Sequence, residues 1–175
     1  MTLCYTGCNI QNNEITKRHL FDLNWKFSYG DPKDALEIKL EDSTWHNIDL
    51  PHDWSKDFNS GNSLNKNPFE DSIVDGWYRK HFEIPEKWDD KNISICFDGI
   101  SNCYEIYINN KRLGKSVVEA STFKKAIDSF INIKGDNLIA IKISVPKEMN
   151  RMGKTNFGIY SNVWLEIKDS SNHKD

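Results

Sequence analysis

The sequence predicts an all-β domain, either a β-sandwich or a jelly roll. Short runs of residues that alternate between apolar and polar follow one another closely along the chain, which is typical of strands that bury one face. Gly, Asn, Asp and Pro residues separate these runs, and almost no run has helical periodicity. With 175 residues, of which 38% are hydrophobic and six are Trp, the chain is long enough for one packed domain.

The expected strands differ in how much of each is buried. Three aromatic side chains share one face of residues 25–29, which predicts a strand with one buried face. By contrast, residues 138–143 are apolar at nearly every position, which predicts a central strand covered on both sides. An edge strand is expected at residues 48–50, because Pro51 follows directly. The other expected strands are residues 77–84, 93–97, 104–108 and 163–167.

Turn-forming residues mark the connections. Asn109 and Asn110 predict a hairpin turn, because asparagine tolerates the positive φ that such turns need. Two short stretches stay open: residues 34–40 could form one helical turn, and residues 127–133 either a strand or a helical turn. Residues 55–75 are rich in Asn, Ser and Gly, so this long loop is either functional or disordered.

Both ends of the chain are expected to lie outside the folded domain. Residues 1–19 are polar and aperiodic and predict a flexible lead-in, and residues 169–175 predict a polar tail, which leaves residues 20–168 as the domain. Within the lead-in, Tyr5–Cys8 resembles the end of a bacterial lipoprotein signal, in which Cys8 would carry the lipid. The alternative is an unstructured N-terminal tail.

Charge and cysteine content exclude several kinds of partner. The net charge of −3 gives no long-range attraction to nucleic acid or anionic membranes. No apolar run reaches the roughly 18–20 residues of a membrane span, so no transmembrane segment is expected. The four cysteines lack the spacing of a zinc site, and we expect no metal or cofactor. Cys96 and Cys103 are either a disulfide across a turn or two buried thiols.

A set of short segments in a fixed order carries a family resemblance. The segments are residues 25–27 (WKF), 50–54 (LPHDW), 76–82 (GWYRKHF), 97–99 (FDG), 105–109 (EIYIN), 113–114 (LG), 157–160 (FGIY) and 163–165 (VWL). Taken together they resemble the N-terminal sugar-binding domain of glycoside hydrolase family 2, which includes β-galactosidases, β-glucuronidases and β-mannosidases.

The resemblance implies a jelly-roll β-sandwich of the galactose-binding-domain type. In this family the domain precedes an immunoglobulin-like domain and a TIM barrel, and the barrel holds both catalytic glutamates. The chain is therefore expected to have no catalytic residues, and to have carbohydrate and the remaining domains of a glycosidase as partners. A stand-alone, non-catalytic carbohydrate-binding module is the alternative. The resemblance also favours a periplasmic or cell-surface location.

The resemblance also indicates where sugar contacts would lie. In the family, the loops that correspond to residues 115–122 and 150–156 approach the sugar pocket, and this chain departs from the family pattern in both. The expected carbohydrate-binding residues are Asp53, Trp54, Glu119, Arg151 and Asn156.

Two of these residues have a structural alternative. Asp53 is expected to accept backbone N–H bonds and fix its loop, whereas Trp54 is expected either to stack on a sugar or, by preference, to pack in the core. Hydrolysis of a glycosidic bond needs two opposed carboxylic acids. The candidates Asp53, Asp75, Asp98 and Glu119 form no evident pair, and Asp98 is best explained as a turn residue.

Overall fold

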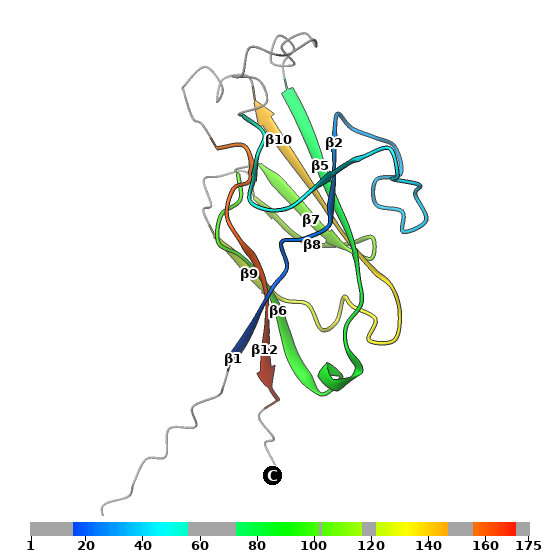
Figure 1. The fold of residues 1–175 in the computed structure, drawn as a ribbon, viewed down its shortest axis with the longest axis vertical. Coiled ribbons are helices and arrows are strands. Elements are labelled where there is room, and N and C mark those ends of the chain that lie inside the picture. The colour runs from blue at the N-terminus through cyan, green and yellow to red at the C-terminus, as the bar shows by residue number, and fades with distance from the viewer. Residues whose placement is uncertain (1–15, 56–72, 102, 117–121, 147–155, 171–175) are drawn as a thin grey trace, which may run out of the picture.

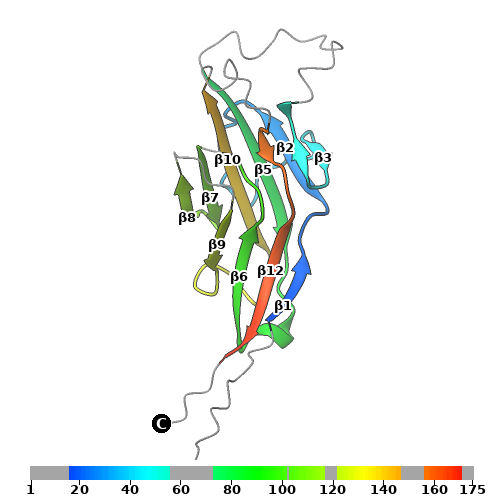
Figure 2. The same ribbon diagram turned by 90° about the vertical axis from the view of Figure 1, so that its left-hand side faces the viewer.

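The computed structural model describes residues 16–55, 73–101, 103–116, 122–146 and 156–170. They form two packed β-sheets (Figures 1 and 2). The strands are β1 (Thr16–Leu20), β2 (Trp25–Tyr29), β3 (His46–Ile48), β4 (His52–Asp53), β5 (Ile73–Phe82), β6 (Lys91–Phe97), β7 (Tyr104–Ile108), β8 (Lys111–Ser116), β9 (Phe123–Ala126), β10 (Asn137–Pro146), β11 (Gly158–Ile159) and β12 (Val163–Asp169). A short 3-10 helix, η2, spans Glu86–Trp88.

The sheet topology confirms the predicted all-β sandwich. One sheet has four strands in the order β1-β12-β6-β9, and the other has six in the order β3-β2-β5-β10-β7-β8. The small pair β11-β4 forms a third sheet, and neighbouring strands in all three run antiparallel. An edge strand precedes Pro51 as expected, but β3 spans His46–Ile48 in place of residues 48–50. As predicted, β10 is a central strand, between β5 and β7.

The main core fills the space between the two large sheets. Each sheet contributes aliphatic and aromatic side chains from alternate positions, as a period-two pattern requires. From the six-stranded sheet come Phe27, Tyr78, Ile106, Ile141 and Ile143, and from the four-stranded sheet come Ile93, Ile95, Phe97, Leu165 and Ile167. The aromatic and aliphatic pattern of the sequence therefore predicts this core correctly.

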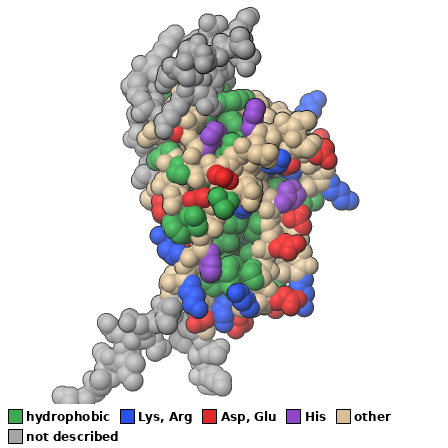
Figure 3. Space-filling model, viewed as in Figure 1, with side chains coloured by type: hydrophobic (Ala, Val, Ile, Leu, Met, Phe, Trp, Pro, Cys, Tyr) green, Lys and Arg blue, Asp and Glu red, His purple; other side chains and the backbone are tan. Residues whose placement is uncertain are grey.

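A second, smaller core covers the outer face of the six-stranded sheet. It contains Ala35, Trp45, Trp77 and Ala140, so the segment between β2 and β3 lies over β5 and β10. This cover explains why residues 137–141 of β10 are buried without alternation, as the sequence predicted. On the face drawn in Figure 3, basic side chains alternate with acidic ones along the lower and right edges.

Arg79 of β5 is the main surprise within the strands. The sequence places it on the face opposite Tyr78, where solvent would be ordinary for an arginine, but its exposed fraction is 0%. Its Nε donates to Asp42 Oδ2 at 2.9 Å, and its Nη1 donates to the carbonyls of Ala35 at 2.5 Å and Glu37 at 3.0 Å. Residues 34–40 themselves form successive turns, with the Glu37 N–H bonded to the Asp34 carbonyl and the Leu40 N–H to the Glu37 carbonyl, and no helix is assigned there.

The structure also changes the expected start of the domain. Residues 16–19 fall in the predicted flexible lead-in, but they belong to β1, which pairs with β12 from Thr16↔Lys168 to Leu20↔Trp164. All five side chains of β1 are exposed. The strand is held at the sheet edge by backbone pairing and by the ion pair of Arg18 with Glu166, and such a strand leaves no apolar pattern in the sequence.

One local expectation is confirmed, one pair of alternatives is resolved, and in one stretch neither expected structure is found. Asn109 and Asn110 have φ of 49° and 62°, as the β7–β8 hairpin requires. Cys96 is a buried free thiol, so it forms no disulfide with Cys103, and burial raises its pKa to about 11. Residues 127–133 form turns in place of a strand or helix. No helix in the described ranges is long and apolar enough to cross a membrane.

Candidate functional site

Three segments meet where the six-stranded sheet ends. There β5 begins and β10 stops, with Ile73 opposite Pro146. The pair β4–β11 lies in the same upper part of the molecule (Figure 1), with Asp53 opposite Gly158 and His52 opposite Ile159. The predicted residues Asp53, Trp54 and Asn156 all belong to this region, which we call the loop-end site.

Asp53 is the residue that joins the segments of the loop-end site. Its Oδ1 accepts hydrogen bonds from the Ser55 N–H at 3.2 Å, the Ser55 hydroxyl at 2.7 Å and the Phe157 N–H at 3.0 Å. Hydrogen bonds to a charged acceptor are stronger than neutral ones. The expectation that Asp53 accepts backbone N–H bonds and fixes its loop is therefore confirmed, and the bonded partner across the site is 104 residues away in the sequence.

Trp54 packs in the core. Its exposed fraction is 0%, and its ring lies 5.6 Å from Phe27, 5.4 Å from Tyr29 and 6.5 Å from Phe157, measured between centroids. Gly76 leaves room for the ring, because a Cβ there would lie 2.9 Å from a Trp54 ring atom. No ring face is open to stack on a sugar, which corrects that alternative. The buried Trp54 Nε1 has no hydrogen-bond partner.

Asn156 is exposed. It directly precedes Phe157, whose N–H donates to Asp53, so it lies close to Asp53. Its carbonyl accepts a hydrogen bond from Ser101 Oγ at 3.2 Å, so its backbone is held while its side chain faces solvent. Glu119 and Arg151 lie outside the described residues. A contact between sugar and Asp53, Glu119, Arg151 or Asn156 stays a prediction.

Sequence reasoning missed two residues that build the loop-end site. Ser101 is buried, and its Oγ accepts from the Gly158 N–H and lies 3.0 Å from the Gly158 carbonyl. Gly158 itself has φ of +113°, a region that side chains rarely allow. The family segment FGIY contains this glycine, but its sequence alone gives no sign of the positive φ.

His52 of β4 contacts Tyr78 of β5 next to the loop-end site. The Tyr78 hydroxyl lies 2.9 Å from His52 Nδ1, and Tyr78 is fully buried. This contact holds β4 against β5, while His52 itself stays partly exposed. The described residues contain no group of three or more His, Cys, Asp or Glu side chains that could hold a metal ion.

Comparison with known proteins identifies the family. The family model for the sugar binding domain of glycosyl hydrolases family 2 matches residues 20–169. A β-galactosidase of Bacteroides ovatus is 30% identical over 151 residues, which cover 85% of this chain and 18% of that protein. A β-glucuronidase of Formosa agariphila is 30% identical over 165 residues, which cover 85% of this chain and 17% of that protein.

A solved structure agrees with this assignment. A glycosyl hydrolase family 2 member from Bacteroides cellulosilyticus superimposes with a TM-score of 0.73 at 33% identity, and the match covers 87% of this chain and 21% of that chain. The chain thus spans about a fifth of the length of such relatives. Because the family model covers nearly all of the folded strands, the chain belongs to glycosyl hydrolases family 2, as its sugar-binding domain.

Proposed function

We propose that this domain serves a β-glycosidase of family 2 that acts on β-galactosides or β-glucuronides. Its part would be to present the loop-end site to the carbohydrate, while the bond is cleaved by carboxylic acids in another domain. The relatives support the substrate class, because they are β-galactosidases and β-glucuronidases. Carbohydrate and the other domains of such an enzyme would be its partners.

The observation that carries the proposal is the bonding of Asp53. One carboxylate oxygen holds the Ser55 and Phe157 N–H groups together, so the segments on both sides of the site keep a fixed relative position. Sugar recognition depends on hydrogen-bonding groups that are already in place before the ligand arrives. A carboxylate used in this way positions a site, whereas a glycosidase acid or nucleophile must face the scissile bond.

NMR titration of the 15N-labelled chain tests this proposal. Methyl β-D-galactopyranoside and methyl β-D-glucuronide are added separately, and amide signals of Ser55, Asn156 and Phe157 are followed. At least one ligand should shift these signals, and Asp53→Ala should weaken that binding several-fold. Asp98→Ala is the matched control, because Asp98 also bonds neighbouring side chains but lies outside the loop-end site.

Two results would contradict the proposal. One is the absence of any shift at the loop-end site with either glycoside at high millimolar concentration. The other is hydrolysis of nitrophenyl β-galactoside or β-glucuronide by this chain alone, because it would place catalytic carboxylic acids within these 175 residues.

A further inference from the structure

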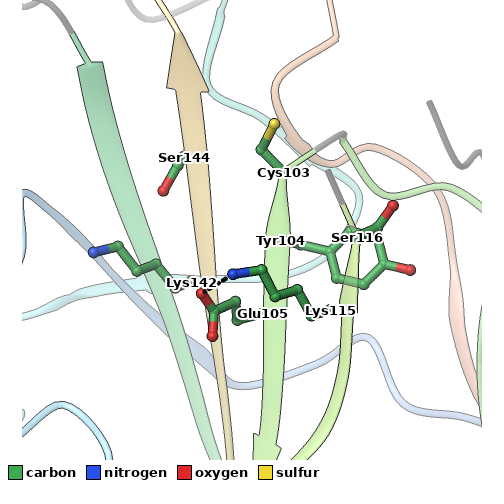
Figure 4. Close-up of a pocket in the computed structure, with 7 residues that line it drawn as sticks. All are labelled: Cys103, Tyr104, Glu105, Lys115, Ser116, Lys142 and Ser144. Atoms are coloured by element: carbon green, nitrogen blue, oxygen red, sulfur yellow. Dashed lines mark hydrogen bonds and ion pairs between the residues drawn. The ribbon is translucent and has the colours of Figure 1, made fainter. Parts of the chain in front are cut away.

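A pocket of about 200 Å³ opens on the outer face of the six-stranded sheet. Its walls come from three adjacent strands, with Glu105 on β7, Lys115 and Ser116 on β8, and Lys142 and Ser144 on β10. We call it the outer-sheet pocket (Figure 4). Adjacent strands of one sheet make a rigid floor, and sites built on strands hold their groups more precisely than loops do.

The β10 side of the outer-sheet pocket is fixed by two carboxylates. The Lys142 ammonium lies 2.9 Å from Asp31 Oδ1 and 3.0 Å from Asp75 Oδ2. The Ser144 hydroxyl donates to Asp75 Oδ1 at 2.5 Å. Figure 4 shows the Lys142 ammonium directed away from Glu105, so the aliphatic part of Lys142 lines the pocket while its charge is neutralised at the side.

The opposite side of the pocket is fixed by Glu105. Its carboxylate accepts from the Tyr107 hydroxyl at 2.6 Å and from Lys115 Nζ at 3.3 Å, and Arg112 Nη1 lies 3.9 Å away. Figure 4 shows the Glu105 carboxylate meeting the Lys115 ammonium. The Glu105 carboxylate is therefore held by its partners, and it has little side-chain entropy left to lose when a ligand binds.

The charges of this network cancel. Three carboxylates, on Asp31, Asp75 and Glu105, face three cations, on Lys115, Lys142 and Arg112. The Tyr107 hydroxyl and then Lys115 hold the pKa of Glu105 below its usual range. Burial lowers the pKa of Lys142, but Asp31 and Asp75 outweigh it and raise the pKa overall. Both groups therefore stay charged near neutral pH.

Such a network suits a ligand that is neutral but rich in hydroxyl groups. A carboxylate accepts and an ammonium donates, and a sugar hydroxyl can do both in return. For a charged ligand, each group that attracts it is paired with a group of the opposite charge, which repels it. The volume is below the roughly 300–1,000 Å³ of sites for drug-sized ligands, which leaves room for a single ring.

We propose that the outer-sheet pocket binds one neutral pyranose ring, as a second saccharide contact separate from the loop-end site. The choice of a sugar as ligand rests on the proposed function. The two sites lie near each other along the chain. Ser101 bonds Gly158 in the loop-end site, and two residues later Cys103 lines the outer-sheet pocket. The Cys103 carbonyl also accepts a hydrogen bond from the Ser144 N–H.

The same labelled chain tests this inference with different signals. Methyl β-D-galactopyranoside, methyl β-D-glucopyranoside and methyl β-D-mannopyranoside serve as neutral probes, and methyl β-D-glucuronide as the charged comparison. At least one neutral probe should shift the amides of Glu105, Ser116 and Ser144, with an affinity higher than that of the glucuronide. Glu105→Gln and Lys115→Met should each weaken this binding at least fivefold, because each removes one charge of the Glu105–Lys115 ion pair that lines the pocket.

Lys134→Met is the matched control, since Lys134 forms an exposed ion pair with Glu86 away from the pocket. It should leave the affinity unchanged, and the overall spectrum of each variant reports whether it is folded. The inference is overturned if no neutral probe shifts the pocket signals, if the glucuronide binds there more tightly, or if both pocket variants bind as the parent does. Signals of Ser55 and Phe157 report the loop-end site separately, so failure of one site is distinguishable from failure of the other.

Discussion

Replacing Gly158 with alanine should destabilise the domain by about 2–6 kcal/mol, from two separate costs. A non-glycine residue at φ of +113° carries backbone strain of about 1–3 kcal/mol. The new Cβ would also overlap the Tyr78 hydroxyl, and it would lie 2.5 Å from the His52 carbonyl oxygen and 2.7 Å from Trp54 Cδ1. Overpacking of this kind typically costs about 1–3 kcal/mol more.

Gly30 offers a control that separates the two costs. It also has a positive φ, +88°, but a Cβ there would meet nothing within 4 Å. Gly30→Ala should therefore show the strain alone, about 1–3 kcal/mol, and Gly158→Ala should exceed it by the cost of the overlap. The difference between the two variants measures how tightly β11 is held against β4 and Trp54.

Urea denaturation followed by circular dichroism provides the free energy of unfolding of both variants and the parent. Small domains have only about 5–15 kcal/mol in total, so the larger loss would be evident from the midpoint. If Gly158→Ala and Gly30→Ala lose the same stability to within about 0.5 kcal/mol, a loss typical of surface changes, the close packing at β11 is refuted. The Ser101–Gly158 bonds would then not hold the loop-end site as described.

Two further predictions concern buried charges. Arg79→Met should cost about 3–5 kcal/mol in urea denaturation, because it removes the Arg79 bonds to Asp42 and to the Ala35 carbonyl, whereas a loss under about 1 kcal/mol would show that the cover over β5 holds without it. Burial raises the pKa of Asp22 above 3.8, although the Val163 N–H bond opposes the shift. The stability it contributes is therefore complete below pH 3.8 and is lost as pH rises through the folded pKa. Asp22→Asn should remove this part of the pH dependence, and identical pH profiles for parent and variant would contradict it.

The strands could be predicted because their causes are local. Alternation of aromatic and aliphatic residues predicts the buried faces of β2, β6, β7 and β12, and paired asparagines predict the β7–β8 turn. These signals depend only on neighbouring residues and on a two-residue period. The edge strand β1 could not be predicted, because its exposed side chains carry no such period. It is held to β12 by backbone pairing and by Arg18, which contacts Glu166 and Trp164.

Arg79 shows a second limit of sequence reasoning. Alternation along β5 places it correctly opposite Tyr78, but whether that face is solvent or core depends on a segment 34 or more residues earlier. Only when residues 35–45 lie over β5 and β10 does an arginine there become buried, beside Trp45 and bonded to Asp42. The cover over this outer sheet face forms by tertiary packing, so the sequence around Arg79 does not indicate it.

Asp53 shows how a family framework can be kept while the residues around the site change. Its partners across the loop-end site are backbone N–H groups and the Ser55 hydroxyl. A bond to the Phe157 N–H does not depend on which side chains stand in the residues before it. Residues 150–156, which depart from the family pattern, can therefore vary without loss of this bond, and so can the side chain at Asn156. Under the proposed function, the Asp53 bonds fix the backbone of the loop-end site, and exposed side chains beside them, such as that of Asn156, are where sugar specificity should be sought.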